Sequence, residues 1–465
     1  MAPDGYPSSP PDFLPTWMDL LYRRNLLTNI TLFDMCLPGT HDSLSYDLSL
    51  TVSAEGTKEY RKIVDLLHTL SAGSLHLLPG EVEEFFRLQA KTQQLTLSQQ
   101  LDNGIRFVDF RMMREPNTGS WYSTHMMQSK HVVEDYWLEL RAWMDAHPHE
   151  VVVLWMSQHG NTAATGKDQY PGVPVDSKQH LWKQFVQIFD GLLLDTRESS
   201  IWTDTLHKLI GRNHRLVVFV SDYVEMTEQS PLALDARKIQ NTWDSDGGVF
   251  HEGQTLPKHL NYFHQAPANN ERVRAHEGFS LLGMNSQVQK WQLSTAATQR
   301  FLPWHSAIVD KLCREKWHLP HAPKHWCPAT LLDIVQLSSY YNQRALEFAF
   351  LNPRAGFPNA LYLDGLDYNG TLRVGTQTLD GADRRGDNEH KDTKYAYVDT
   401  ILARNFALAC DSTPGQREIC SGLNKALEDR RKLNPLSRWD EPQLGRHSRW
   451  PGDFEDENTR GIDST

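Results

Sequence analysis

The sequence predicts a parallel α/β fold, and three observations support this prediction. Short runs rich in β-branched residues alternate with segments of helical periodicity from residue 30 to residue 409. Several of these runs are nearly continuous apolar runs, as is typical of strands that are buried on both faces. The chain has 465 residues, of which 39% are hydrophobic, and this is enough for one large core or for about three ordinary domains. Because the alternation continues over most of the chain, we expect one large α/β unit.

The expected strands are short and lie far apart in the sequence. They are Thr31–Leu37, Ile105–Met112, Val151–Ser157, Leu216–Ser221, Phe279–Met284 and Ala360–Leu363. The segments of helical periodicity are Leu97–Leu101, Val132–Ala146, His180–Phe189, Thr330–Phe350 and Tyr395–Ala409. Because catalytic side chains collect where the strands of a parallel barrel end, the strand ends are where we look for chemistry.

Three segments stand outside this alternation. Residues 1–29 are predicted to be an N-terminal leader, which is rich in Pro and polar residues at its start. Residues 49–91 are predicted to be a helical insert that includes a short helix over Glu81–Leu88. The insert either covers the rim of the fold or forms a lipid-contacting lid over the site, and the first interpretation is favoured. Residues 410–465 are dominated by Arg, Asp, Glu, Pro and Gly, which predicts a disordered tail.

The composition excludes several classes of protein. There are 47 Lys and Arg residues against 58 Asp and Glu, which gives a net charge of −11. Such a chain is a poor candidate for coating nucleic acid or for electrostatic docking on anionic lipid. No run approaches the roughly 18 uncharged apolar residues of a membrane span, and the N-terminus lacks the pattern of a secretory signal. The five Cys residues suit a reduced compartment, and we therefore expect a cytoplasmic protein that can touch membranes peripherally.

The first motif with chemical content is the run LPGTHDS at residues 37–43. It reads as a strand that ends in a Pro-Gly turn and then presents His41 beside Asp42. A histidine can accept or donate a proton near neutral pH, which few unperturbed side chains can do. A His-Asp pair at a turn is more often structural than functional, so this motif needs a second one beside it.

The second motif follows a short helix and a Gly turn. Asp109 and Arg111 are two residues apart on an expected strand, so their side chains point to the same side. A carboxylate and a guanidinium inside an apolar strand are costly unless they are paired or used. His125 ends the next short apolar run. Two histidines with an arginine suit phosphodiester chemistry, because one histidine can act as base and the other as acid while the arginine holds the phosphate oxygens.

Together these motifs resemble the catalytic X domain of the phosphatidylinositol-specific phospholipase C superfamily. The likeness is carried by LPGTHDS, by QLDNGIRFVDFR at residues 100–111, by the run STH that ends at His125, and by HPHE at residues 147–150 before a Val-rich strand. The first two motifs in this order are specific, whereas either alone would not be. The resemblance implies a distorted TIM-type (β/α) barrel of the PLC-like phosphodiesterase kind. It also implies a phosphoric diester hydrolase or lyase whose substrate is a phospholipid at a membrane surface.

The resemblance also implies roles for individual residues. His41 corresponds to the general base that takes the proton of the inositol 2-hydroxyl group, and His125 to the general acid that protonates the departing diacylglycerol oxygen. Asp42 corresponds to the aspartate that orients the acid histidine. Arg111 corresponds to the arginine that bridges the phosphate and the nucleophile, and Asp109 to the acidic residue that steadies this arginine.

Further residues complete the predicted site. Asp364 is the candidate carboxylate partner of the base, and Asp367 is the alternative. Ser157 and Gln158 occupy the neighbourhood where relatives often present a Lys or Glu towards the substrate, and Trp243 is a candidate for lining the pocket. We count these three as candidate substrate-binding residues.

Arg111 also bears on cofactors. Calcium-using relatives have an acidic residue at this position, and a fixed guanidinium there would repel the ion and replace its charge. We therefore expect no metal and no other cofactor. A run of two Cys and three His between Cys313 and Cys327 has ligands enough for zinc but matches no common spacing, so a loop is the favoured interpretation.

Two other functions remain open at this point. A glycosidase on the same kind of barrel would need two catalytic carboxylates about 5 to 10 Å apart and would have no need of His41 or Arg111. A catalytically weak lipid-binding protein could keep the barrel, but it would have no need of a proton donor and a proton acceptor. No protein partner is predicted.

Overall fold

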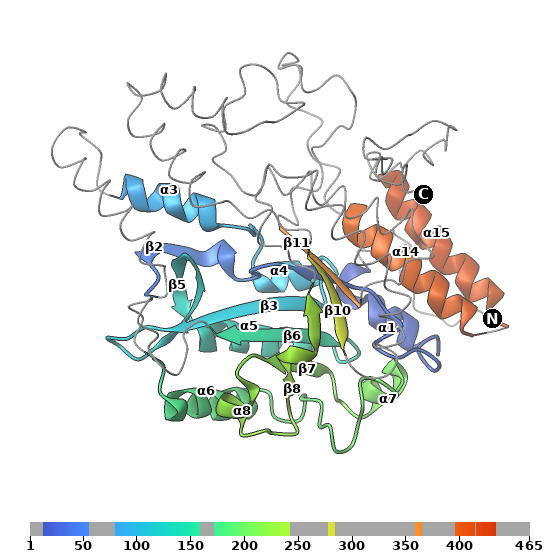
Figure 1. The fold of residues 1–465 in the computed structure, drawn as a ribbon. Coiled ribbons are helices and arrows are strands. Elements are labelled where there is room, and N and C mark those ends of the chain that lie inside the picture. Colours follow the sequence, from blue (N-terminus) through green and yellow to red (C-terminus); the bar gives the residue numbers. More distant parts are fainter. Residues whose placement is uncertain are drawn as a thin grey trace, which may run out of the picture.

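The computed structural model describes residues 13–54, 80–158, 172–241, 278–283, 359–364, 396–413 and 415–433 (Figure 1). The expected helix Thr330–Phe350, the Cys313–Cys327 run, Trp243 and Asp367 lie outside these residues. Among the described helices, none combines the length and the apolar character that a membrane-spanning helix needs.

Parallel strands form the centre of the fold. In chain order they are β1 (Leu37–Thr40), β3 (Phe107–Arg114), β6 (Val152–Gln158), β7 (Leu216–Val220), β8 (Leu234–Asp235), β9 (Ile239–Asn241), β10 (Phe279–Gly283) and β11 (Ala360–Leu363). Apart from β8 and β9, each strand pairs in parallel with the next one in this series, and β11 pairs with β1, which brings the series back to its start. Within the described residues, β8 and β9 are the one consecutive pair that no ladder joins. This order is that of a distorted TIM-type barrel, and the predicted fold class is confirmed.

Antiparallel strands extend the sheet beyond β3. The strand β4 (Trp121–His125) pairs with β3, β5 (Met127–Val132) pairs with β4, and β2 (Leu48–Val52) pairs with β5. Helix α3 (Glu81–Ala90) packs against β2. The short helix expected at Glu81–Leu88 is therefore present, whereas the start of the predicted helical insert is a strand, and residues 55–79 of the insert lie outside the described part of the chain.

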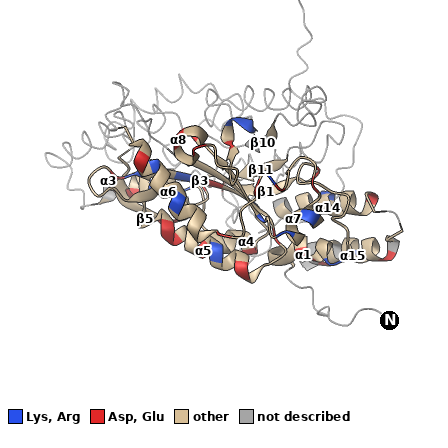
Figure 2. Cartoon of the chain, turned by 90° about the horizontal axis from the view of Figure 1, so that it is seen from below, with Lys and Arg blue, Asp and Glu red and all other residues tan. Residues whose placement is uncertain are grey.

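The helices on the outside of the barrel are amphipathic. They include α4 (Leu97–Asp102), α5 (Val133–Ala146), α6 (Val175–Ile188), α7 (Leu206–Gly211) and α8 (Tyr223–Thr227). Helix α4 begins with a capping box between Thr96 and Gln99. Helix α5 buries Trp137 and Leu140, and both acidic and basic residues occur along it (Figure 2).

Aromatic side chains fill the interior of the barrel. Phe107 of β3 stacks on Phe279 of β10 with 6.0 Å between ring centroids, and it lies 5.9 Å from Tyr362 of β11. Phe219 of β7 lies 5.4 Å from Phe279. Gly39 of β1 has no room for a side chain, because a Cβ atom there would lie 3.0 Å from side-chain atoms of both Phe107 and Tyr362. The motif glycine is thus required by the close approach of three strands.

The first barrel strand begins later in the sequence than predicted. The expected strand Thr31–Leu37 is wrong, because Asp34 accepts hydrogen bonds from the backbone and the hydroxyl of Thr31 and closes a turn there. The first barrel strand begins later, at Leu37, and includes Pro38 and Gly39 themselves.

The described part of the N-terminal segment, which begins at residue 13, packs on the barrel. Helix α1 (Trp17–Tyr22) buries Trp17 completely, and Glu150 accepts hydrogen bonds from the backbone of Met18 and Asp19 at its start. Glu150 is also paired with Arg106 at 2.7 Å, and both side chains are fully buried. The N-terminal segment is therefore fastened to a buried ion pair of the barrel.

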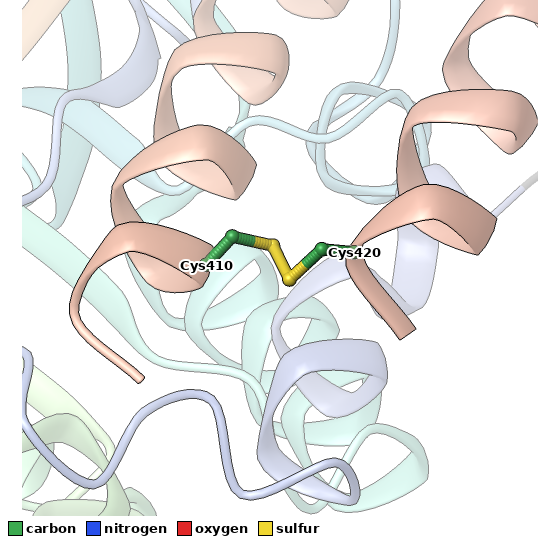
Figure 3. Close-up of a disulfide and its surroundings, with 2 residues drawn as sticks. All are labelled: Cys410 and Cys420. Atoms are coloured by element: carbon green, nitrogen blue, oxygen red, sulfur yellow. A yellow bond between two sulfur atoms is a disulfide. The ribbon is translucent and has the colours of Figure 1, made fainter. Parts of the chain in front are cut away.

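The C-terminal segment corrects another prediction. Residues 417–433, expected to be disordered, form helix α15, which packs beside α14 (Ala396–Asp411). A disulfide joins Cys410 of α14 to Cys420 of α15 (Figure 3). Because disulfides persist mainly in oxidising compartments, this pair is not what the expectation of a reduced compartment predicts.

Candidate active site

The candidate site lies one pleat beyond the aromatic interior, at the carboxyl ends of the strands. Side chains two residues apart on a strand point the same way. His41 follows Gly39, Asp109 follows Phe107, and Asp364 follows Tyr362 in this manner. The fold thus brings the polar residues of three strands together above one apolar floor.

His41 lies between a carboxylate and a guanidinium. Its Nδ1 atom lies 2.6 Å from Oδ1 of Asp364, and its Nε2 atom lies 2.6 Å from Nη2 of Arg111. Because a carboxylate only accepts and a guanidinium only donates, Nδ1 carries the proton and Nε2 presents a lone pair. This is the tautomer that a general base needs, and it is set by two residues from other strands.

Arg111 is held in place by two carboxylates. Its Nε atom lies 2.7 Å from Oδ1 of Asp42, and its Nη2 atom donates to Oδ2 of Asp109 at 3.0 Å. Burial alone would lower the pKa of the guanidinium, but Asp109 and Asp42 outweigh it and raise the pKa. The arginine is therefore a permanent positive charge in contact with Asp109 and Asp42.

Asp42 is the contact between the two histidines. Its Oδ2 atom lies 3.3 Å from Nε2 of His41 and also 3.3 Å from Nε2 of His125. Its backbone has a φ of 44°, in the left-handed region, and its N–H donates to Asp109 at 3.1 Å. Aspartate is one of the few residues that tolerate this region, which turns the chain sharply after β1.

His125 comes from the end of β4 and faces His41. The two rings lie 6.1 Å apart between centroids at an interplanar angle of 71°. The Nδ1 atom of His125 donates at 2.6 Å to the carbonyl of Ala90, at the end of α3. This hydrogen bond leaves Nε2 directed at Asp42, so the second imidazole also has a defined orientation.

The charges around His41 set its pKa. Burial opposes the imidazolium, but Asp42 and Asp364 favour it, and together they raise the pKa of His41 above its usual value although Arg111 lowers it. A histidine of raised pKa is a stronger base once it has lost its proton.

The site also contains a donor set of a kind that metal ions use. Ligand atoms of His41, Asp42 and Asp109 lie within 4.8 Å of one another. Both carboxylates are already bound by Arg111, so a cation there would have to displace a buried guanidinium. The residues therefore fit a site whose positive charge comes from arginine better than a calcium site.

Two of the three predicted substrate-binding residues lie on strand β6, and the third is outside the described residues. Ser157 of β6 is half-buried and is the register partner of Arg111, so it lies beside the arginine. Gln158 is the last residue of β6, paired in register with Met112. Trp243 lies outside the described residues.

Two residues near the site had no signal in the sequence. Gln93 and Thr92 follow α3 and donate from their side chains to the carbonyl of His41. A buried glutamine in a short irregular segment belongs to no motif or period, and only the folded structure reveals its contacts.

The fold and the site together define a (β/α) barrel with a largely buried centre of two imidazoles, three carboxylates and one guanidinium, in which His125 is partly exposed. The family model described as PI-PLC X 1 matches residues 85–246, so this part of the chain is similar to the PI-PLC X family. The matched range includes Asp109, Arg111 and His125, whereas His41, Asp42 and Asp364 lie outside it. In the folded barrel, these three residues lie beside the matched residues Arg111 and His125.

Curated relatives carry the same family description. The chain is 27% identical over 218 residues to PI-PLC X domain-containing protein 1 of Mus musculus, covering 46% of this chain and 56% of the relative. The Homo sapiens protein of that name is 26% identical over 44% of this chain and 56% of its own, and the Danio rerio protein is 25% identical over 57% and 83%. The chain thus spans little more than half the length of the mouse and human relatives.

Solved structures give a weaker likeness. Phosphatidylinositol-specific phospholipase C from Listeria monocytogenes aligns with 76% of this chain and 93% of its own, at 13% identity and a TM-score of 0.43. A mutant of the Staphylococcus aureus enzyme covers 76% and 90%, also at 13% identity and a TM-score of 0.43. No residue or role is transferred from these structures.

Proposed function

We propose that the protein is a PI-PLC-like phosphodiesterase that cleaves the head-group ester of a phosphatidylinositol-type phospholipid without calcium. The observation that carries the proposal is the placement of His41 and His125 on the two sides of Asp42, with Arg111 beside them. Such a set can remove one proton, deliver another and neutralise a phosphate between them. A lipid substrate implies peripheral contact with a membrane surface.

In the proposed reaction His41 acts as the general base. Its Nε2 atom takes the proton of the 2-hydroxyl group, and the oxygen attacks the neighbouring phosphorus. The bond between phosphorus and the diacylglycerol oxygen breaks, and His125 donates its proton to that oxygen. A cyclic phosphodiester and diacylglycerol leave, and the attack is favoured because it occurs within one molecule.

In this reaction Arg111 would exchange its contact with His41 for a contact with the phosphate. Its Nη2 atom lies on the lone pair of His41 Nε2, which is the atom that must accept the proton. A phosphate oxygen that draws the guanidinium towards itself would free that lone pair. Substrate binding would thus release the base at the moment when the arginine begins to stabilise charge on phosphate.

The two other functions fit the site less well. A glycosidase needs a carboxylic acid as proton donor and a second carboxylate, but Asp42, Asp109 and Asp364 all lie within contact of a histidine or an arginine. A protein that only binds lipid would have no use for two oriented imidazoles. A catalytically weak lipid-binding protein remains the alternative, and the cleavage assay described next distinguishes it from an active phosphodiesterase.

The experiment is a cleavage assay on vesicles that carry one candidate head-group at a time. We expect a water-soluble inositol phosphate and diacylglycerol from phosphatidylinositol, with no release from vesicles of phosphatidylcholine alone. Binding to phosphatidylinositol vesicles without any product would show a lipid-binding protein and contradict the proposal.

A further inference from the structure

Gln93 connects the two strands that carry the base and its carboxylate partner. Its side-chain Nε2 atom donates to the carbonyl of His41 at 2.9 Å and to the carbonyl of Leu363, also at 2.9 Å. Leu363 is the residue immediately before Asp364. The Gln93 side chain is fully buried and comes from neither strand.

The hydrogen bonds of Gln93 lie where the ladder between β1 and β11 ends. The ladder between β1 and β11 ends with the pair Thr40 and Leu363, so His41 and Asp364 lie just beyond the last paired residues. Past that pair, the backbone N–H of His41 still donates to the carbonyl of Leu363 at 3.0 Å. The Gln93 amide adds a second donor to the same carbonyl, at the point where the ladder between β1 and β11 ends.

We propose that Gln93 is a positioning residue that sets the separation and orientation of His41 and Asp364, and hence the strength of the base. This inference rests on the proposed function for its catalytic meaning, but its geometric part does not. Without the Gln93 amide, the strand ends keep the backbone hydrogen bond from His41 to Leu363 but lose the side-chain bridge, so they can separate more widely and the Nδ1 hydrogen bond to Asp364 lengthens.

The same segment also reaches the second histidine. The carbonyl of Ala90, three residues before Gln93, accepts the Nδ1 hydrogen bond of His125. The hydroxyl of Thr92 donates to the carbonyl of His41 at 3.1 Å, and the backbone N–H of Gln93 donates to Ser45. Residues 90–93 therefore hold both imidazoles from the end of α3.

The test measures the titration of His41, so the groups that face His41 must be considered together. They are Asp42 beside it, Asp109 and Arg111 of β3, His125 of β4, Tyr362 of β11, and Asp364 just after β11. Substitution of Gln93 leaves all of these side chains in the chain. A change in the titration would then report a change in their geometry.

The experiment compares Gln93→Met with a matched control, Asn405→Leu. Asn405 is also fully buried, and its amide bonds the backbone N–H and carbonyl of Cys36, just before the other end of β1. Both substitutions keep side-chain size and remove buried hydrogen bonds, so both are expected to destabilise the fold. Only Gln93 touches the end of β1 that carries His41.

The measurements are the pKa of His41 by NMR of the labelled imidazole, and kcat and KM on phosphatidylinositol vesicles. We expect Gln93→Met to lower the pKa of His41, because Asp364 then stabilises the imidazolium less, and to lower kcat about 10- to 100-fold at unchanged KM. Asn405→Leu should leave the pKa of His41 at the wild-type value. Equal pKa and kcat values in the two folded variants would overturn the proposal.

A measurement on the wild-type protein keeps the proposal testable if Gln93→Met does not fold. The side-chain amide protons of Gln93 should exchange slowly with solvent, and their chemical shifts should follow the titration of His41. Exchange at the rate of a free amide would contradict the bridge. Because these titrations need no turnover, a protein that cleaves no lipid would refute the proposed function and leave the positioning role open to the same test.

Discussion

His41 donates from Nδ1 to a carboxylate oxygen of Asp364 at 2.6 Å, although 323 residues separate the two in the sequence. The contact exists because the last barrel strand, β11, pairs with the first, β1. Both side chains are buried, so the charge that forms on the imidazole is not screened by water. The pairing of β11 with β1 therefore also places the carboxylate of Asp364 beside the proposed base, His41.

The first prediction concerns pH. A general base works only when it is neutral, so kcat/KM should rise with pH through the pKa of His41 in the free enzyme. Asp42 and Asp364 raise this pKa, and Asp364→Asn removes one of the two carboxylate charges. The rising limb of the pH profile should therefore move to lower pH while the maximal rate falls. A limb that moves to higher pH, or stays in place, would contradict the role of Asp364.

The second prediction concerns the source of positive charge. We propose that Arg111 supplies the cation, and on that proposal activity in EGTA should equal activity in added calcium. Arg111→Gln should lower kcat by about 10² to 10³, the usual effect of losing a donor to developing charge. Loss of activity in EGTA with recovery in calcium would show that a metal, and not the arginine, carries this role.

The third prediction concerns the N-terminal segment and the barrel. Arg106→Met removes one partner of a fully buried ion pair and leaves Glu150 as an unpaired charge. We expect the free energy of unfolding to fall by about 3 to 5 kcal/mol. Arg23→Ala, which breaks the exposed pair with Asp19, is the control and should cost less than about 1 kcal/mol. Denaturant titration measures both, and similar losses would mean that the buried pair does not fasten the segment.

The fourth prediction concerns the two C-terminal helices. The disulfide closes a loop between residues 10 apart in the sequence, and the model of chain entropy gives it about 2 to 3 kcal/mol. Cys410→Ser should therefore increase hydrogen exchange in α15, with no change in the strands of the barrel. Titration of thiols in the unfolded wild-type protein should show that Cys410 and Cys420 do not react. Two reactive thiols at these positions would favour the reduced compartment that the composition suggests.

The sequence allowed some elements to be predicted and not others, for identifiable reasons. The strands β7 and β11 are continuous apolar runs, and β6 is apolar from Val152 to Met156, so their positions follow directly from that pattern. The strand β1 was misplaced because Pro38 and Gly39 are typical of turns, whereas here the glycine is needed for packing against Phe107. Residue propensities describe local backbone preferences, and here the tertiary packing of Gly39 overrides the turn preference of Pro38 and Gly39.

The site shows the same division. His41, Asp109 and Arg111 could be proposed from their motifs, because titratable side chains at strand ends in apolar surroundings are unusual. Asp364 depended on the resemblance, since nothing near it in the sequence points to His41. Gln93 could not be found at all, because its importance lies in two carbonyls that the fold brings together.

The most direct test of the account measures kcat for His41→Ala, His125→Ala and the double variant on phosphatidylinositol vesicles. Each single variant should lose about 10² to 10⁴ in kcat, the usual contribution of a general acid or base. Because base and acid serve one reaction, the double variant should lose much less than the product of the two single losses. If wild-type, His41→Ala and His125→Ala proteins release inositol phosphate at the same rate, the two histidines are not the acid–base pair.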